Sequence, residues 1–399
     1  MRTSLIRLVA ASAIATLTLT ACGSDDGGSD AGGGDGGSDG GGALVGEGTG
    51  DDCVIEGTVP IGAALSLTGG AASYGASQKN GLELAAEHLA EKEGVTYELT
   101  IEDDATDPKQ GISVFEGFAG DGTSLIIGPT LSNGAFQAQP IAQEEGVPVL
   151  AISNTADGIT AQGDYIFRDS LTEGQVIPQT VAKAKEVYGL EKVVVMYSND
   201  DAFTESGYDV FASSLEAEGV EVLDTLTFSK ADTDFRPLLT DAKAAGPDAI
   251  VVSGLIEAAI PLVTQARELG IDLPIIGGNG FNNPLLMSDA GDAAEGVVVG
   301  AAWNSASDNP ENTAFLEAYE AKYDAQPDQF AAQAYTGLML VDQAVRTNCS
   351  GERDDIRDGL GQLHEVPSVL GTISINDDRD AEHEAVVQVV KDGSFAVLD

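Results

Sequence analysis

From residue 54 onward, short apolar runs alternate with longer segments in which apolar residues recur every three or four positions. The second pattern is typical of amphipathic helices, and in residues 81–90 it places Leu82, Ala85 and Leu89 on one face. Strict alternation of strands and helices predicts parallel sheets covered by helices on both faces. The predicted strands are 59–65, 97–102, 124–127, 147–152, 192–197, 220–227, 249–253, 274–276 and 296–300. The predicted helices include 175–188, 206–218, 234–245, 258–269, 311–323 and 330–347, and strand character returns at 369–375 and 385–390.

The alternation restarts near Glu173, so the pattern predicts two doubly wound α/β lobes rather than one. A chain of 399 residues also suits two domains better than one core. Ligands of open α/β sheets bind beyond the carboxyl ends of the strands. Two such lobes facing each other would therefore hold a ligand in the cleft between them, although the pattern does not identify that ligand.

The N-terminus has a different character. Arg2 and Arg7 precede an apolar run over 8–21, which predicts a secretory signal in residues 1–21. The run ends in Ala21-Cys22-Gly23, which resembles the lipobox of bacterial lipoproteins and implies acylation of Cys22. The alternative is a plain signal peptide with an incidental cysteine. Residues 22–52 are then the acylated cysteine and a disordered linker rich in Gly, Ser and Asp.

The net charge and the few cysteines and histidines argue against several classes of function. The formal net charge of −46 argues against nucleic acid or anionic lipid headgroups as direct partners. The three cysteines and three histidines are scattered, so no metal site or cofactor is expected. The chain shows neither a nucleophile elbow nor zinc-ligand spacing, and we therefore do not expect an enzyme. Cys53 and Cys349 are expected to form a disulfide in an oxidising compartment, the alternative being two buried thiols.

Several motifs resemble one family in both order and spacing. Residues 61–70 followed by Tyr74-Gly75, then 127–132, 146–156, 290–297 and 334–336, are similar to the leucine/isoleucine/valine-type periplasmic binding proteins. These are the type I solute-binding components of ABC importers. The resemblance implies two parallel-sheet lobes joined by three hinge strands. It places the N-terminal lobe at 54–172 plus 303–371 and the C-terminal lobe at 173–302 plus 372–399.

The resemblance also implies the ligand contacts of the first lobe. Ser132, at the start of a helix, corresponds to the serine that binds a ligand carboxylate, and free N–H groups at a helix start favour an anion. Alternatively, Ser132 only caps its own helix. Ser153 corresponds to a position that offers backbone groups and Thr155 to one that offers a hydroxyl. Tyr74 and Phe330 correspond to aromatic residues that flank the ligand side chain, or else they pack within the lobe.

The second lobe departs from the family pattern. Asn279 stands where amino-acid binders have an acidic residue for the ligand ammonium, and Leu255 stands where a tyrosine is expected. Either Glu257, Glu173 or Asp201 supplies the charge from a different angle, or the ligand is an amide, a urea-like molecule or a carboxylic acid. Phe203 follows a strand of this lobe and is a further candidate for the cleft, with loop packing as its alternative.

The function implied is an extracytoplasmic solute-binding protein, anchored as a lipoprotein to the outer face of the cell membrane. It would act as a monomer that captures an amino acid-like, amide or carboxylate ligand by hinge closure and delivers it to an ABC permease. The alternative is a ligand-sensing lipoprotein that presents its closed form to a receptor kinase. The binding residues would be the same in both cases.

Overall fold

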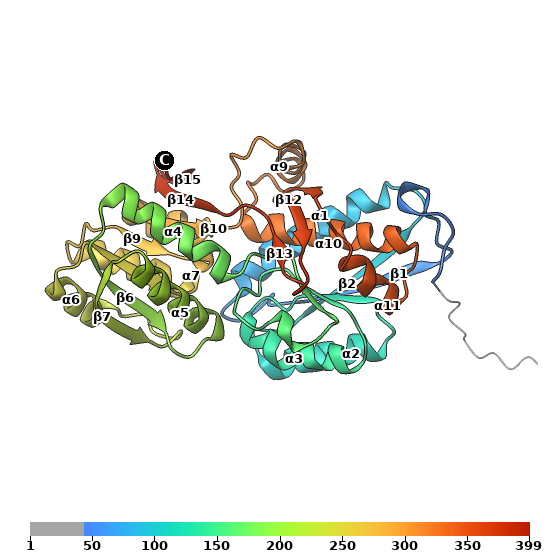
Figure 1. Ribbon diagram of the computed structural model, residues 1–399, viewed down its shortest axis with the longest axis horizontal. Coiled ribbons are helices and arrows are strands. Elements are labelled where there is room, and N and C mark those ends of the chain that lie inside the picture. The colour runs from blue at the N-terminus through green and yellow to red at the C-terminus, as the bar shows by residue number, and fades with distance from the viewer. Residues whose placement is uncertain (1–43) are drawn as a thin grey trace, which may run out of the picture. The chain divides into compact units, whose positions relative to one another are not determined.

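The computed structural model describes residues 44–399, which contain two separate main sheets (Figure 1). The predicted signal segment, Cys22 and most of the predicted linker lie outside these residues. Within 44–399 we find no helix that is both long enough and apolar enough to cross a membrane. The prediction of an α/β protein with two parallel-sheet lobes is confirmed.

The first sheet has five parallel strands in the order β2-β1-β3-β4-β5. Its strands are β1 (Thr58–Leu65), β2 (Thr96–Asp103), β3 (Leu125–Ile127), β4 (Val149–Ala151) and β5 (Ile166–Arg168). Its helices are α1 (Ala72–Ala90), α2 (Pro108–Gly120) and α3 (Ser132–Glu144), joined later in the chain by α9 (Pro310–Tyr323), α10 (Gln329–Asn348) and α11 (Arg353–Leu360). Every residue of β3, β4 and β5 is buried, as expected for strands covered on both faces.

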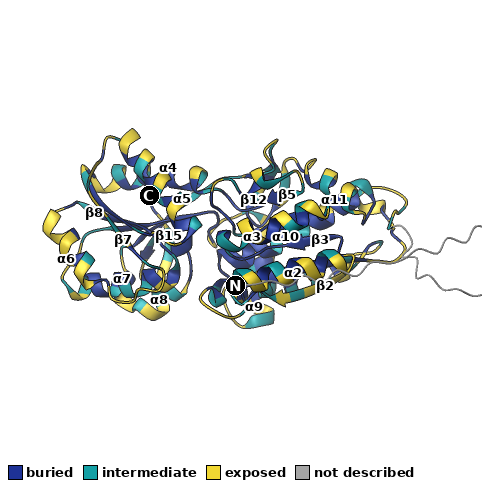
Figure 2. Cartoon of the chain, turned by 90° about the horizontal axis from the view of Figure 1, so that it is seen from below, coloured by how far each residue is buried: buried dark blue, intermediate teal, exposed yellow. Residues whose placement is uncertain are grey.

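The second sheet has seven strands in the order β15-β14-β10-β9-β8-β6-β7. Its parallel strands are β6 (Lys192–Ser198), β7 (Glu221–Phe228), β8 (Ala249–Ser253), β9 (Ile275–Gly277) and β10 (Val298–Ala301). Two antiparallel strands, β14 (Val386–Lys391) and β15 (Ser394–Val397), complete one edge. The helices are α4 (Glu173–Tyr188), α5 (Ala202–Ala217), α6 (Arg236–Ala245), α7 (Ile256–Glu268) and α8 (Leu285–Ala290). Figure 2 shows the buried strands inside and the exposed helix faces outside.

The chain passes between the two sheets three times: after β5, after β10, and before β14. The third passage comes later than the sequence predicted. Residues from 372 onward were assigned to the second lobe, yet Ile373, Ile375 and Ala381 pack into the core of the first. They belong to a small sheet of β11 (Val366–Ser368), β12 (Gly371–Ile375) and β13 (Ala381–Glu382), whose cross-strand pairing keeps this segment beside the first lobe.

The disulfide between Cys53 and Cys349 ties the start of the body to the end of α10, with the two Cα atoms 5.4 Å apart. Residues 44–52 were predicted to belong to a disordered linker, but they pack against the body. The disulfide explains this difference, because it lies next to them. Val45 pairs with Ser350 in an antiparallel bridge, and Gly46 donates its N–H to the Cys349 carbonyl at 2.8 Å. The bonded cysteines hold this backbone against the end of the helix.

Removing the disulfide should destabilise the protein, because the bond joins residues 296 positions apart and so restricts the unfolded chain strongly. We expect Cys53→Ser/Cys349→Ser to lose about 2–5 kcal/mol of unfolding free energy in urea titrations. Adding a reductant should lower the stability of the wild type to the same extent and leave the double variant unchanged. Equal stability of the two proteins without reductant would contradict this prediction.

Candidate ligand-binding cleft

A cavity lies where loops from the carboxyl ends of both sheets meet, and its empty space is about 410 Å³ with the open solvent at its mouth included. Of the residues predicted to contact the ligand, all line it except the three acidic candidates Glu257, Glu173 and Asp201. These lining residues are Tyr74, Ser132, Ser153, Thr155, Phe203, Leu255, Asn279 and Phe330. Within the described chain, no lining side chain is charged, although the protein as a whole carries a net charge of −46.

One end of the cleft is suited to an anion or a carbonyl oxygen. Ser132 is the first residue of α3 and is buried, and its hydroxyl does not cap its own helix. The hydroxyl oxygen accepts only a long hydrogen bond, 3.4 Å from the Ala156 N–H. Thr155 Oγ1 is buried and makes no hydrogen bond of good geometry among residues 44–399, although it lies close enough to the Glu173 carboxyl group to lower its pKa. Two hydroxyls and the free N–H groups of a helix start are therefore available to a ligand.

Ser153 contributes differently. Its hydroxyl donates to the Thr130 carbonyl at 2.6 Å and accepts from Gln78 Nε2 at 2.7 Å. Because both hydrogen bonds stay inside the first lobe, the side chain fixes the loop, and its backbone remains for the ligand. Thr130 Oγ1 in turn donates to Gln78 Oε1 and accepts from the Ser66 N–H.

The other end of the cleft is apolar. The Tyr74 and Phe330 rings meet edge to face, with centroids 4.6 Å apart, and Phe203 and Leu255 line the cleft from the second lobe. The Tyr74 hydroxyl is not free for a ligand, because it donates to the Gly280 carbonyl at 2.8 Å and accepts from the Ile256 N–H at 2.7 Å. Burial raises the pKa of Tyr74 well above its ordinary value, so this bridge between lobes stays neutral.

The neutral Asn279 is backed by a buried acid. Its Nδ2 donates to Glu173 Oε1 at 2.9 Å, and its Oδ1 faces Gln329 Nε2 at 3.4 Å. Burial raises the pKa of Glu173 to about 7, which the hydrogen bond from Asn279 partly offsets. The other two acids considered from the sequence are placed differently. Glu257 is exposed in the first turn of α7, and Asp201 accepts from the Phe203 and Thr204 N–H groups at the start of α5.

Five further residues line the cleft that were not predicted as ligand contacts: Thr130, Leu131, Gly280, Gln329 and Gln333. Three of them are direct neighbours of predicted residues along the chain. Gln333 lies one helical turn beyond Gln329 on α10, so helical periodicity extended from Phe330 was the signal that would have found it. Its Oε1 is buried without a hydrogen-bond partner within the described part of the chain.

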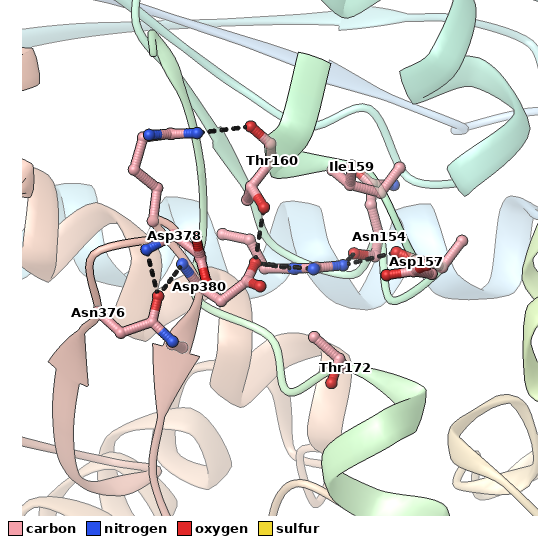
Figure 3. A network of polar contacts seen from close by, with 12 residues as sticks. Asn154, Asp157, Ile159, Thr160, Thr172, Asn376, Asp378 and Asp380 are labelled. Atoms are coloured by element: carbon pink, nitrogen blue, oxygen red, sulfur yellow. Dashed lines mark hydrogen bonds and ion pairs between the residues drawn. The ribbon is translucent and has the colours of Figure 1, made fainter. Parts of the chain in front are cut away.

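The loop that carries Thr155 is held from behind by Arg168, which is only 1% exposed. Its Nη1 donates to the carbonyls of Asn154 and Ala156, at 2.9 and 2.8 Å, and its Nη2 lies 2.7 Å from Asp380 Oδ1. Asp380 lies between β12 and β13 and also accepts from the Thr160 hydroxyl (Figure 3). Arg168, at the end of β5, thus connects the loop that carries Thr155 to the segment that carries Asp380. These two segments precede the first and the third passage of the chain between the lobes.

Further hydrogen bonds close the rim of the cleft. Asn133, next to Ser132, donates through Nδ2 to Asp201 Oδ2 at 2.9 Å and accepts from the Ala202 N–H at 2.8 Å. Nearby, the Asp157 N–H donates to Ser206 Oγ at 3.0 Å. Each bond joins the first lobe to the start of α5 in the second, so the structure describes a closed arrangement of the cleft.

Two α/β lobes that close over a small, uncharged cleft, with polar groups at one end and aromatic rings at the other, define a solute-binding protein. The match to the periplasmic binding protein model over residues 58–394 shows that the chain belongs to that family.

Individual relatives agree with this assignment. The chain is 28% identical to a Leu/Ile/Val-binding protein of Rhizobium johnstonii over 81% of its own length and 88% of the relative's. It resembles the branched-chain amino acid transporter substrate-binding protein of Streptococcus pneumoniae in complex with isoleucine (TM-score 0.80, 28% identity, 85% and 98% coverage). It also resembles a solute-binding protein of an ABC transporter from Rhodopseudomonas palustris in complex with 3,4-dihydroxybenzoic acid (TM-score 0.78, 26% identity, 85% and 95% coverage).

The rim contacts predict a loss of affinity that does not depend on the ligand. Asn133→Ala removes two hydrogen bonds made only when the lobes are closed, each worth roughly 0.5–1.5 kcal/mol. We expect titration calorimetry with two ligands of different chemistry to show the same fold weakening for both. Gln137→Ala, at an exposed position of the same helix, is the matched control and should bind as the wild type does. A loss confined to one ligand would instead place Asn133 in contact with that ligand.

Proposed function

We propose that this protein is the solute-binding component of an ABC importer and captures a small carboxylate-bearing molecule between its lobes. The observation that carries the proposal is the uncharged cleft between the lobes, whose lining includes the start of α3 and the hydroxyls of Ser132 and Thr155. A ligand carboxylate or carbonyl would bind there through hydrogen bonds, and an apolar body would pack against the edge-to-face pair of Tyr74 and Phe330. Hinge closure then presents the loaded form to the permease.

The ligands of two relatives support this class of solute. Isoleucine and 3,4-dihydroxybenzoic acid, named for the structural relatives, are both small molecules that combine a carboxylate with a largely apolar body. They differ in the ammonium group, which only the amino acid carries. The proposed class for this protein is therefore an amino acid-like, amide or carboxylate ligand whose apolar body packs against the paired aromatic side chains of Tyr74 and Phe330.

The cellular setting follows from the N-terminal sequence together with the family. The apolar run over 8–21 and the Ala21-Cys22-Gly23 motif support export and acylation of Cys22, which would leave a monomer tethered to the outer face of the membrane. The core packing supports an N-terminal lobe of 54–172 plus 303 to about 382, and a second lobe of 173–302 plus the remaining residues.

The proposal is tested by a thermal-shift screen of residues 44–399 against amino acids, aliphatic and aromatic carboxylates, amides and sugars. Ligands that bind only the folded protein raise its melting temperature by mass action. We expect the largest shifts from small carboxylates with apolar bodies. Stabilisation by sugars, with no shift from any carboxylate, would show that the cleft serves another class of solute.

Ser132→Ala should weaken the best carboxylate by roughly 1–3 kcal/mol, because a ligand oxygen loses its hydroxyl partner inside a buried site. Titration calorimetry of the variant and the wild type measures the difference directly. Ser113→Ala provides the control, since Ser113 is an exposed serine on α2, and should leave affinity unchanged. Unchanged affinity in Ser132→Ala would exclude this hydroxyl as a ligand contact.

A further inference from the structure

A buried carboxyl group, that of Glu173, lies directly behind the residues that line the cleft. Glu173 is 1% exposed and accepts a hydrogen bond from Asn279 Nδ2 at 2.9 Å. Within residues 44–399 it forms no ion pair, since the nearby Arg168 is already bound to Asp380. A buried carboxyl group without a cation is costly in its ionised form, so such groups are usually paired. The fold therefore keeps an acid beside the ligand site that has hydrogen-bond donors but forms no ion pair.

Contacts with residues of both lobes fix the position of Glu173. It lies in the first turn of α4, whose start is fixed by a reciprocal pair of hydrogen bonds between Thr172 and Gln175. Its N–H donates to the Thr155 carbonyl at 3.2 Å. Thr155 and Asn279 both line the cleft, one from each lobe, so Glu173 stands directly behind the two polar residues that face the ligand.

Glycines keep the space around this carboxyl group clear. A Cβ atom at Gly278 would lie 3.1 Å from Glu173 Oε2, and one at Gly207 would lie 3.7 Å from it. The orientation of Asn279 is also informative. Because its Nδ2 is directed at Glu173, its carbonyl oxygen is the end left to accept a hydrogen bond from a ligand. The Thr155 hydroxyl is a second acceptor for the same ligand group.

The other acids near the cleft are already engaged. Asp201 caps α5 and bonds Asn133, while Asp328 accepts from the Ser77 hydroxyl at 2.7 Å and from the Ala331 N–H at the start of α10. Glu257 does not line the cleft and its residue is exposed, although desolvation also raises the pKa of its carboxyl group to about 7. Asp201 and Asp328 are also buried and form no ion pair among the described residues, but each already accepts from backbone N–H groups at a helix start. The Glu173 carboxyl group bonds only to side chains that line the cleft.

We propose that Glu173 is the specificity-determining residue that provides the counter-charge for an amino group on the ligand. The N–H groups of that ammonium bond to Asn279 Oδ1 and the Thr155 hydroxyl, and the carboxylate behind them stabilises its charge. Charge attraction is strong in a site shielded from water, even without direct contact. The inference rests on the proposed function, because the ligand carboxylate must lie at Ser132, and it narrows the ligand to a small zwitterion with an apolar body.

The test compares molecules that differ only in the amino group: L-leucine against 4-methylpentanoate, and L-phenylalanine against 3-phenylpropanoate. Binding of each to the full chain is measured by titration calorimetry. We expect the wild type to prefer at least one amino acid over its matched acid by tenfold or more. Glu173→Gln, which keeps the shape and one acceptor oxygen, should abolish that preference while leaving the affinity for the acid within about twofold.

A double variant that exchanges the acid and the amide between positions 173 and 279 distinguishes a loss of negative charge from a disturbance of the fold. In Glu173→Gln/Asn279→Asp, the amide introduced on α4 donates to the carboxylate introduced in the lining. The hydrogen bond therefore persists with its polarity reversed, and the negative charge moves into the cleft wall. This double variant should recover the preference for the amino acid. Glu257→Gln removes an exposed acid near the same lobe and should leave the preference unchanged, which controls for a general effect of negative charge.

The outcomes discriminate between the two proposals. Equal wild-type affinity for amino acids and matched acids, or an unchanged preference in Glu173→Gln, would overturn the role of Glu173 while leaving the carboxylate site in place. If the wild type bound none of the four probes but a sugar stabilised it, the proposed function itself would be wrong. Should Glu173→Gln fail to fold, a double variant that folds but shows no preference would equally refute the assignment.

Discussion

The site depends on a constraint of parallel sheets. All strands of such a sheet end at the same edge, and the loops and helix starts that follow them share one side. In this protein two sheets direct those edges at one space, so groups distant in sequence become the two walls of a cleft. The Tyr74 hydroxyl shows the consequence most directly. A side chain of the first lobe satisfies the Ile256 N–H and the Gly280 carbonyl of the second, so one buried phenol joins the walls.

The same geometry couples ligand contact to movement of the lobes. Arg168 ends β5, just before the chain first passes to the second lobe, and binds both the ligand loop and Asp380. A shift of the passages between lobes therefore acts on the backbone that carries Thr155. The buried guanidinium thus holds the ligand loop and the segment that carries Asp380 in a fixed relation to each other.

The surface and the cleft differ in charge. The net charge of −46 keeps the exterior strongly acidic, whereas the lining presents hydroxyls, amides and rings. An uncharged lining can accept a carboxylate without repulsion, provided that nearby acids are neutral or engaged. Burial has this effect on Glu173, whose pKa of about 7 allows it to be protonated in the empty cleft and to ionise when a cation arrives.

The sequence alone determined the order of strands and helices and the two-lobed fold, because periodicity is a local property of the chain. Most of the cleft lining was implied by the resemblance of its motifs to a known family. Gln333 could also have been predicted from the sequence, because it lies one helical turn after Gln329 and Phe330. The tertiary structure decided what depends on partners distant in sequence. It attached residues 44–52 through Cys349, and it kept β12 and β13 with the first lobe through strand pairing. It also placed Glu257, Glu173 and Asp201 in different surroundings, which the sequence could not foresee. Only folding brings one acid behind Asn279 and leaves another in solvent, and burial then sets which of them can act on a ligand.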